Sequence, residues 1–217
     1  MNRRKFIKNS ALAATLVGVS PNLSTAFNKP VSHKKIIFVF RGVAYADAFN
    51  AFQKVNPSGL SGSHIQKITC SNSSYTHTEG MDQLLKGLGK NHEVMESQLQ
   101  EKFSIAQIVE DAFSVNHKKT PVYHLHHTEI GHSSNKLYTE KLEEFFTELL
   151  KHYKEGHHQV IVTADIGRNA NNNSCGGKDH SNATCLETFA LFIGGNTAQL
   201  AAHTGPLPQE NILIQKF

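Results

Sequence analysis

Apolar runs alternate with amphipathic stretches along the chain, and this order predicts a fold built from strands and helices in turn. The run at 35–40 is typical of a strand buried on both faces of a sheet. The stretches at 121–126, 160–163 and 188–193 predict further strands. His64–Thr69 alternates between apolar and polar residues, which predicts a more peripheral strand. The apolar residues 212–214 predict a short final strand.

Three stretches are predicted to be helical. The clearest is 135–154, where seven large apolar residues fall on one stripe: Tyr138, Leu142, Phe145, Phe146, Leu149, Leu150 and Tyr153. We also expect helices over 78–88 and over 93–113, the latter in two pieces broken near Ser104. Strands that alternate with helices favour right-handed crossovers, so we expect an α/β fold, a three-layer α/β/α sandwich with a mostly parallel central sheet.

The N-terminus has the pattern of an export signal. A basic patch at 2–8 precedes a short apolar run at 11–19, and Ser24-Thr25-Ala26 offers small residues for cleavage. We therefore predict a signal peptide over 1–26, a polar tether over 27–33 and a single domain over 34–217. The Arg3-Arg4 pair is typical of a twin-arginine signal, with an ordinary secretory signal as the alternative. The apolar run is too short for a membrane anchor, so we expect a periplasmic or otherwise exported protein without a membrane span.

Removal of the signal changes the charge balance. The signal carries four basic residues and no acidic ones, so its loss from 22 basic residues leaves 18, equal to the 18 acidic ones. The mature protein is formally neutral and has no basic stripe, which argues against nucleic acid as a partner.

The chain has three cysteines, Cys70, Cys175 and Cys185. Export permits disulfides, and a Cys175–Cys185 bridge would close the loop that carries His180. Cys70 is then left over as a small buried residue. No C-x2-C pair is present, which argues against a zinc site built from cysteines.

Polar residues follow several of the predicted strands. Arg41-Gly42 follows the first strand, and Asp165, with His180 one loop later, follows the strand at 160–163. In open α/β sheets, ligands bind beyond the carboxyl ends of the strands, so these residues are candidates for a site. A polar turn with an Asn-rich loop is the alternative for the stretch that contains Asp165.

Hydroxyl residues at 71–78 lead into a predicted helix. Ser and Thr at a helix N-terminus cap free backbone N–H groups, which alone would explain them. The same geometry also suits a nucleophile or a bound anion, so both interpretations stay open.

Four histidines and a glutamate lie within nine residues, at 124–132. In a strand, His124 and His126 share one face, while His127 and His132 lie at or beyond its end. Neutral imidazoles together with a carboxylate suit zinc and similar ions. The alternative is a solvated strand end with surface histidines.

The order of these pieces resembles the alkaline phosphatase/sulfatase superfamily. The most specific matches are Gly131-His132-Ser133 and Thr163-Ala164-Asp165-x-Gly167, and the resemblance runs from about Lys34 to Gly195. It also extends to an exported branch of that superfamily whose members begin with twin-arginine signals. It implies an alkaline phosphatase-like fold with two metal ions, often zinc, beside a Ser or Thr nucleophile.

Carried over by position, the resemblance makes His132 and His180 ligands of one metal and Asp165 a ligand of the other. Thr76 or Thr78 takes the place of the nucleophile.

Three positions depart from the pattern of that superfamily. Arg41, Thr128 and Ile166 stand where metal ligands are usual: two aspartates and a histidine. We hypothesise that Arg41 pairs with Asp165 in place of the second metal, because a guanidinium binds a carboxylate through two hydrogen bonds. At most one divalent ion then remains, most simply zinc, held by His132, His180 and either His127 or Glu129.

The sequence therefore favours an exported, hydrolase-like protein with a reduced metal site. Its expected substrate is an anionic small-molecule or glycan ester of phosphate or sulfate, and Arg41 is a candidate to hold the anionic group. One alternative is an inactive relative that binds a ligand or a partner protein. Another is a periplasmic metal-binding protein that relies on the histidine cluster.

Overall fold

The computed structural model describes residues 34–70, 76–98, 104–126, 132–169, 171–179, 187–195, 197, 200 and 207–213. The predicted signal and tether lie outside these residues, and so do His127, Glu129, His180 and Cys185. Predictions that concern them stay predictions.

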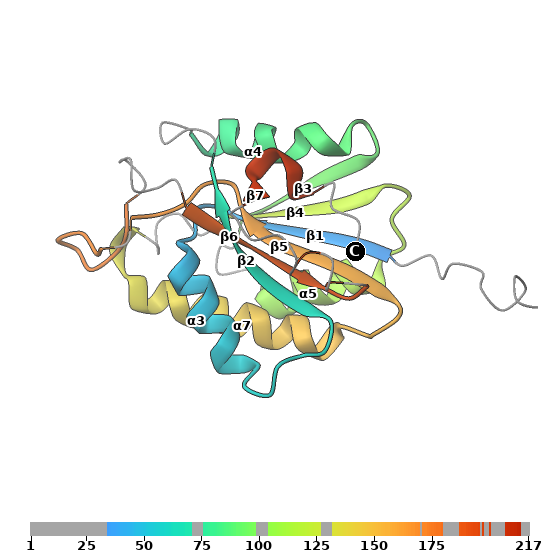
Figure 1. Cartoon of the computed structure of the whole chain (residues 1–217), viewed down its shortest axis with the longest axis horizontal. Coiled ribbons are helices and arrows are strands. Elements are labelled where there is room, and N and C mark those ends of the chain that lie inside the picture. The colour runs from blue at the N-terminus through green and yellow to red at the C-terminus, as the bar shows by residue number, and fades with distance from the viewer. Residues whose placement is uncertain are drawn as a thin grey trace, which may run out of the picture. The chain divides into compact units, whose positions relative to one another are not determined.

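A seven-stranded sheet forms the centre of the described domain (Figure 1). The strands are β1 (Lys34–Phe40), β2 (Ser63–Thr69), β3 (His92–Gln98), β4 (Thr120–His126), β5 (His158–Ala164), β6 (Glu187–Ile193) and β7 (Leu207–Pro208). Their order is β3-β4-β1-β5-β6-β2-β7. β6 is antiparallel to both of its neighbours, and all the other pairs are parallel. The sheet is thus mostly parallel.

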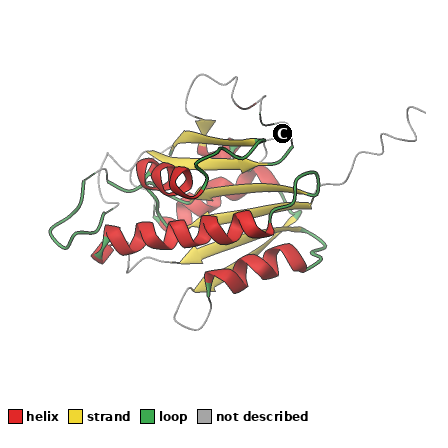
Figure 2. Cartoon of the chain, turned by 90° about the horizontal axis from the view of Figure 1, so that it is seen from below, coloured by secondary structure: helices red, strands yellow, loops and turns green. Residues whose placement is uncertain are grey.

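Helices cover both faces of this sheet (Figure 2). One face carries α3 (Tyr45–Val55), α5 (Ile105–Ser114) and α7 (Asn135–His152), which share a core with the strands. The other face carries α4 (His77–Leu85) and the short 3-10 helices η1 (Lys86–Leu88) and η3 (Gln209–Asn211). The fold is the expected three-layer α/β/α sandwich.

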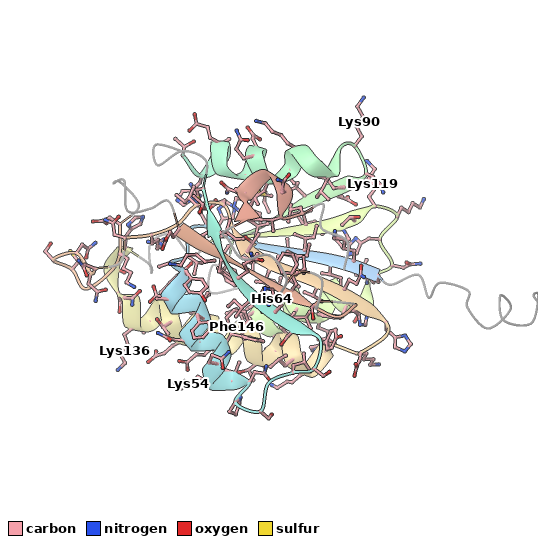
Figure 3. The ribbon with its side chains drawn as sticks, in the orientation of Figure 1. Lys54, His64, Lys90, Lys119, Lys136 and Phe146 are labelled. Atoms are coloured by element: carbon pink, nitrogen blue, oxygen red, sulfur yellow. The ribbon has the colours of Figure 1, made fainter. Side chains whose placement is uncertain are left out.

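Strand β1 shows why the apolar runs are continuous. Ile36, Phe38 and Phe40 belong to the core beneath α3, α5 and α7, which also includes Phe146 of α7, labelled in Figure 3. Residues 37 and 39 belong to the core beneath α4. Because both faces are covered, every one of these β1 side chains is buried, and a polar residue would have no partner on either face.

The predicted set of elements needs three corrections. Residues 93–98, expected to be helical, lie in β3, an edge strand whose polar residues are tolerated because only β4 pairs with it among the described residues. Helix α3 was not predicted, although its Ala48, Ala51 and Phe52 are buried. The final strand is the two-residue β7 rather than 212–214, because Ile212 and Leu213 instead fill the core beneath α4.

Two further expectations concern cysteines and the membrane. Cys70 is buried, as expected, and Cys175 is exposed and not bridged in this structure, so its pairing with Cys185 stays a prediction. Among the described helices, none has the length and apolar character needed to cross a bilayer.

Gly80 sets the close approach of α4 to the end of β5. A Cβ atom at this position would lie 2.8 Å from the carbonyl carbon of Asp165 and 2.8 Å from Cγ2 of Ile166. In known structures, Cβ atoms essentially never come this close to another heavy atom. A methyl group at residue 80 would therefore push α4 away from the sheet.

We predict that Gly80→Ala destabilises the domain by roughly 1–3 kcal/mol because of this overpacking. Elsewhere in a helix, the same change stabilises by about 0.5–1 kcal/mol. Urea unfolding measures the difference in free energy of unfolding between the variant and the wild type. The control is Thr78→Ala, which changes an exposed residue of α4. A stabilised Gly80→Ala variant would show that α4 does not pack this closely.

Candidate metal centre

Four parallel strands bring their carboxyl ends to one edge of the sheet. Arg41 follows β1, Asp165 follows β5, and His124 and His126 lie at the end of β4. Glu96 lies near the end of β3 and is paired in register with His124. The expected convergence of polar residues at this edge is therefore present, with Glu96 as an addition.

Glu96, His124 and His126 form a cluster that could hold a metal ion. Each offers one ligand atom, and these atoms lie within 4.8 Å of one another. The two histidines are two residues apart in β4 and so share a face, and their ring centroids are 4.5 Å apart. The sequence predicted this shared face correctly.

The hydrogen bonds show which ring nitrogens converge. Nδ1 of His124 lies 3.1 Å from Oε2 of Glu96, and Nε2 of His126 contacts the same oxygen. Partial burial would raise the pKa of Glu96, but its hydrogen bonds and charge interactions with the two histidines lower it. The Glu96 side chain is 57% exposed and that of His124 is 7% exposed, so the cluster opens to solvent on the Glu96 side.

Asp165 lies behind this cluster and is completely buried. Its carboxylate accepts from the backbone N–H of Gly42 at 2.9 Å, and it lies 3.0 Å from Nδ1 of His77 and 3.2 Å from Nε2 of His124. Burial would raise the pKa of Asp165, but the hydrogen bonds and charges of the two imidazoles outweigh it and lower the pKa. Asp165 is thus held as a carboxylate.

His124 connects the buried carboxylate with the exposed one. Its Nε2 faces Asp165 and its Nδ1 faces Glu96. Burial lowers the pKa of His124, but the two carboxylates raise it by more, which favours an imidazolium in the absence of a metal. A cation at Nδ1 would replace that proton while Nε2–H stays on Asp165. Metal-binding histidines commonly have such a carboxylate partner on the other nitrogen.

Gly42 presents its N–H to Asp165 from a turn with φ of 71°, a conformation that favours glycine. Its carbonyl oxygen accepts from the Tyr138 hydroxyl at 2.8 Å and from Nε of Arg168 at 2.6 Å. Arg168 is itself only 1% exposed. These contacts give Tyr138 and Arg168 a positioning role beneath the site.

Arg41 does not pair with Asp165, so this hypothesis from the sequence is wrong. The Asp165 oxygens are already engaged by Gly42 and two histidines. Arg41 instead places Nη1 3.0 Å from Nδ1 of His126. It therefore lies beside the Glu96–His124–His126 cluster.

The two candidate threonines have different surroundings. Thr76 is the N-cap of α4, and its Oγ1 accepts from the N–H of Glu79 at 3.3 Å and donates to the Glu79 carboxylate at 2.9 Å. This capping box is the simpler of the two interpretations left open by the sequence. Thr78 is exposed on α4. A role for either as nucleophile stays a prediction.

His132 is not one of the three clustered residues. Its Nδ1 is 3.2 Å from Oδ1 of Asp179, which also accepts from Nδ2 of Asn173 at 3.0 Å. His180, the expected second ligand beside it, is outside the described residues, so a metal role for this pair stays a prediction.

Two residues of the site were missed from the sequence. Glu96 was missed because its stretch was expected to be helical, so no pairing with β4 was considered. His77 was noted only as part of a Ser/Thr-rich loop, although a histidine directly after the N-cap Thr76 begins α4 at the sheet edge.

The fold is similar to that of a domain of known structure. The C-terminal periplasmic domain of EcEptC from Escherichia coli, in a crystal structure in complex with zinc, is 8% identical, with 77% of this chain and 74% of that chain covered and a TM-score of 0.45. A second crystal structure of that domain gives 7% identity, 82% and 79% coverage and a TM-score of 0.44. No protein-family model and no curated protein matches the chain.

We predict that Asp165→Asn lowers the free energy of unfolding by roughly 3–5 kcal/mol in the presence of a chelator, because it leaves the buried imidazole of His124 without its buried counter-charge. The Asp165–His124 ion pair contributes most to the free energy of unfolding at pH values between 3.8 and 6.5, the ordinary pKa values of the two side chains. Its contribution is lost as the pH falls through the lowered pKa of Asp165 or rises through the raised pKa of His124.

Urea unfolding of both proteins from pH 3 to pH 9 measures this effect. The control is Asp82→Asn, which changes an exposed residue of α4. This variant should shift the free energy of unfolding by less than about 0.5 kcal/mol. A stability difference for Asp165→Asn that does not change with pH would contradict the assigned charge states.

Proposed function

We propose that this protein is an exported, metal-dependent hydrolase of phosphate or sulfate esters that works with one divalent ion. The supporting observation is the convergence of Glu96, His124 and His126, whose ligand atoms lie within 4.8 Å of one another at the carboxyl edge of the sheet.

The donor set suits zinc. Two imidazoles and one carboxylate are the protein ligands of a known class of catalytic zinc sites, which keep one coordination position open for water or substrate. When bound, such an ion polarises an ester oxygen and lowers the pKa of a coordinated water molecule. The partial exposure of Glu96 would let an ester reach the ion from solvent.

The other residues of the edge would orient these ligands. Asp165 holds Nε2 of His124, which leaves Nδ1 directed at Glu96. Arg41 adds a cation beside His126, which suits an anionic ester. Because the Thr76 hydroxyl is engaged in the capping box, water rather than this side chain is the nucleophile that we favour.

A metal-binding protein without catalysis is the second candidate. It is favoured by the capping role of Thr76, since the expected hydroxyl nucleophile already has a structural use. The two candidates make the same prediction for metal content and different predictions for turnover.

Metal analysis of the purified chain tests the site. We expect one zinc per chain, lost in His126→Ala and strongly weakened in Glu96→Gln, because each change removes a ligand. His132→Ala is the matched control, since it removes a half-exposed histidine that contacts Asp179 and is not one of the three clustered residues. Zinc lost from His132→Ala and retained by His126→Ala would favour the ligand set expected from the sequence instead.

Turnover of aryl phosphates, phosphodiesters and aryl sulfates then tests the reaction. We expect zinc-dependent hydrolysis that falls to background in His126→Ala and persists in Thr76→Ala, which should lose only about 1 kcal/mol of stability with its cap. Full zinc loading without turnover of any ester would leave the metal-binding protein as the function.

A further inference from the structure

The two ring nitrogens of His126 have different partners, and these partners define its tautomer. Nδ1 lies 3.0 Å from Nη1 of Arg41, and Nε2 contacts the carboxylate of Glu96. A guanidinium has only N–H donors, so Nδ1 must be the acceptor. A neutral imidazole has one donor and one acceptor, which places its proton on Nε2, where it donates to Glu96.

A metal ion at Nε2 requires the opposite arrangement. The lone pair at Nε2 would face the ion, and the ring proton would move to Nδ1. Arg41 and Nδ1–H would then be two donors facing each other. The guanidinium and the divalent ion would in addition repel one another across one imidazole ring. Arg41 in its present position and a metal ion on His126 therefore exclude each other.

Among the described residues, no carboxylate pairs with Arg41 and holds it elsewhere. Within the part of the chain that the structure describes, no ion pair within 4.0 Å involves its guanidinium. Its Nε is buried and has no hydrogen-bond partner among these residues. Once displaced from His126, the side chain would be a half-buried cation with several uncommitted donors beside the metal.

We propose that Arg41 competes with the metal ion for His126, and that metal binding releases Arg41 to bind the anionic group of the substrate. This inference rests on the proposed function and adds the residue that selects an anionic ester. Arg41 would thus act as an anion receptor only in the metal-loaded protein. Because binding free energies are reciprocal, an oxyanion that engages Arg41 would in turn strengthen metal binding.

Calorimetric titration of the purified chain with zinc, and then with sulfate as the simplest oxyanion, tests both parts. We expect zinc to bind about tenfold more tightly to Arg41→Gln than to the wild type. Changes in the partner of a metal-binding histidine alter the affinity by at least this factor, and here the change removes a competitor instead of a support. We expect sulfate to bind the zinc-loaded wild type, but neither the zinc-free wild type nor zinc-loaded Arg41→Gln.

Lys136→Gln is the matched control. Lys136 is an exposed cation on the first turn of α7 (Figure 3), so its removal changes the net charge equally without touching His126. We expect this variant to bind zinc and sulfate as the wild type does. Arg41→Lys keeps a donor-only cation and should keep the weaker, wild-type zinc affinity, which separates the competition from any effect of Arg41→Gln on folding.

Two results would overturn the inference while leaving the proposed function intact. One is equal zinc affinity in the wild type, Arg41→Gln and Arg41→Lys. The other is equal sulfate binding by zinc-loaded wild type and Arg41→Gln. Failure of every variant to bind zinc would overturn the proposed metal site itself, and the inference with it.

Discussion

The buried carboxylate of Asp165 is the constraint on which the rest of the structure depends. A charge with no solvent exposure is costly unless donors surround it. Its partners come from three elements: Gly42 after β1, His77 at the start of α4 and His124 near the end of β4. The carboxylate therefore connects the ends of β1 and β4 with α4, which lies on one face of the sheet. A purely apolar core would align these elements less specifically.

The same carboxylate links the fold to the chemistry. It occupies Nε2 of His124, so the other ring nitrogen points outward to Glu96, and one imidazole spans from the core to the solvent-facing edge. Rigid support of this kind limits the orientations that a ligand side chain can adopt. The candidate metal centre is thus built on two strands of the sheet rather than on loops.

Two residues next to Asp165 and at the end of β1 have physical consequences here. Ile166 is 3% exposed, and its Cγ2 lies where α4 comes closest to the end of β5, so this residue makes an apolar contact between the helix and the sheet. Arg41 turns to His126 on the neighbouring strand instead of to Asp165. The site is therefore arranged around the β3–β4 side of the edge, where Glu96 completes it.

The sequence by itself determined that β1 is a strand buried on both faces, because a short continuous apolar run is typical of such a strand. It also determined that His124 and His126 share a face, because side chains two residues apart in a strand always do. Only the tertiary structure decided the position of Glu96 beside His124. These residues are 28 positions apart, and Glu96 lies on an edge strand whose polar sequence we expected to be helical. The tertiary structure also decided that His77, 88 residues before Asp165, is a partner of that carboxylate. Such contacts depend on strand order and register, which local patterns of polarity do not encode.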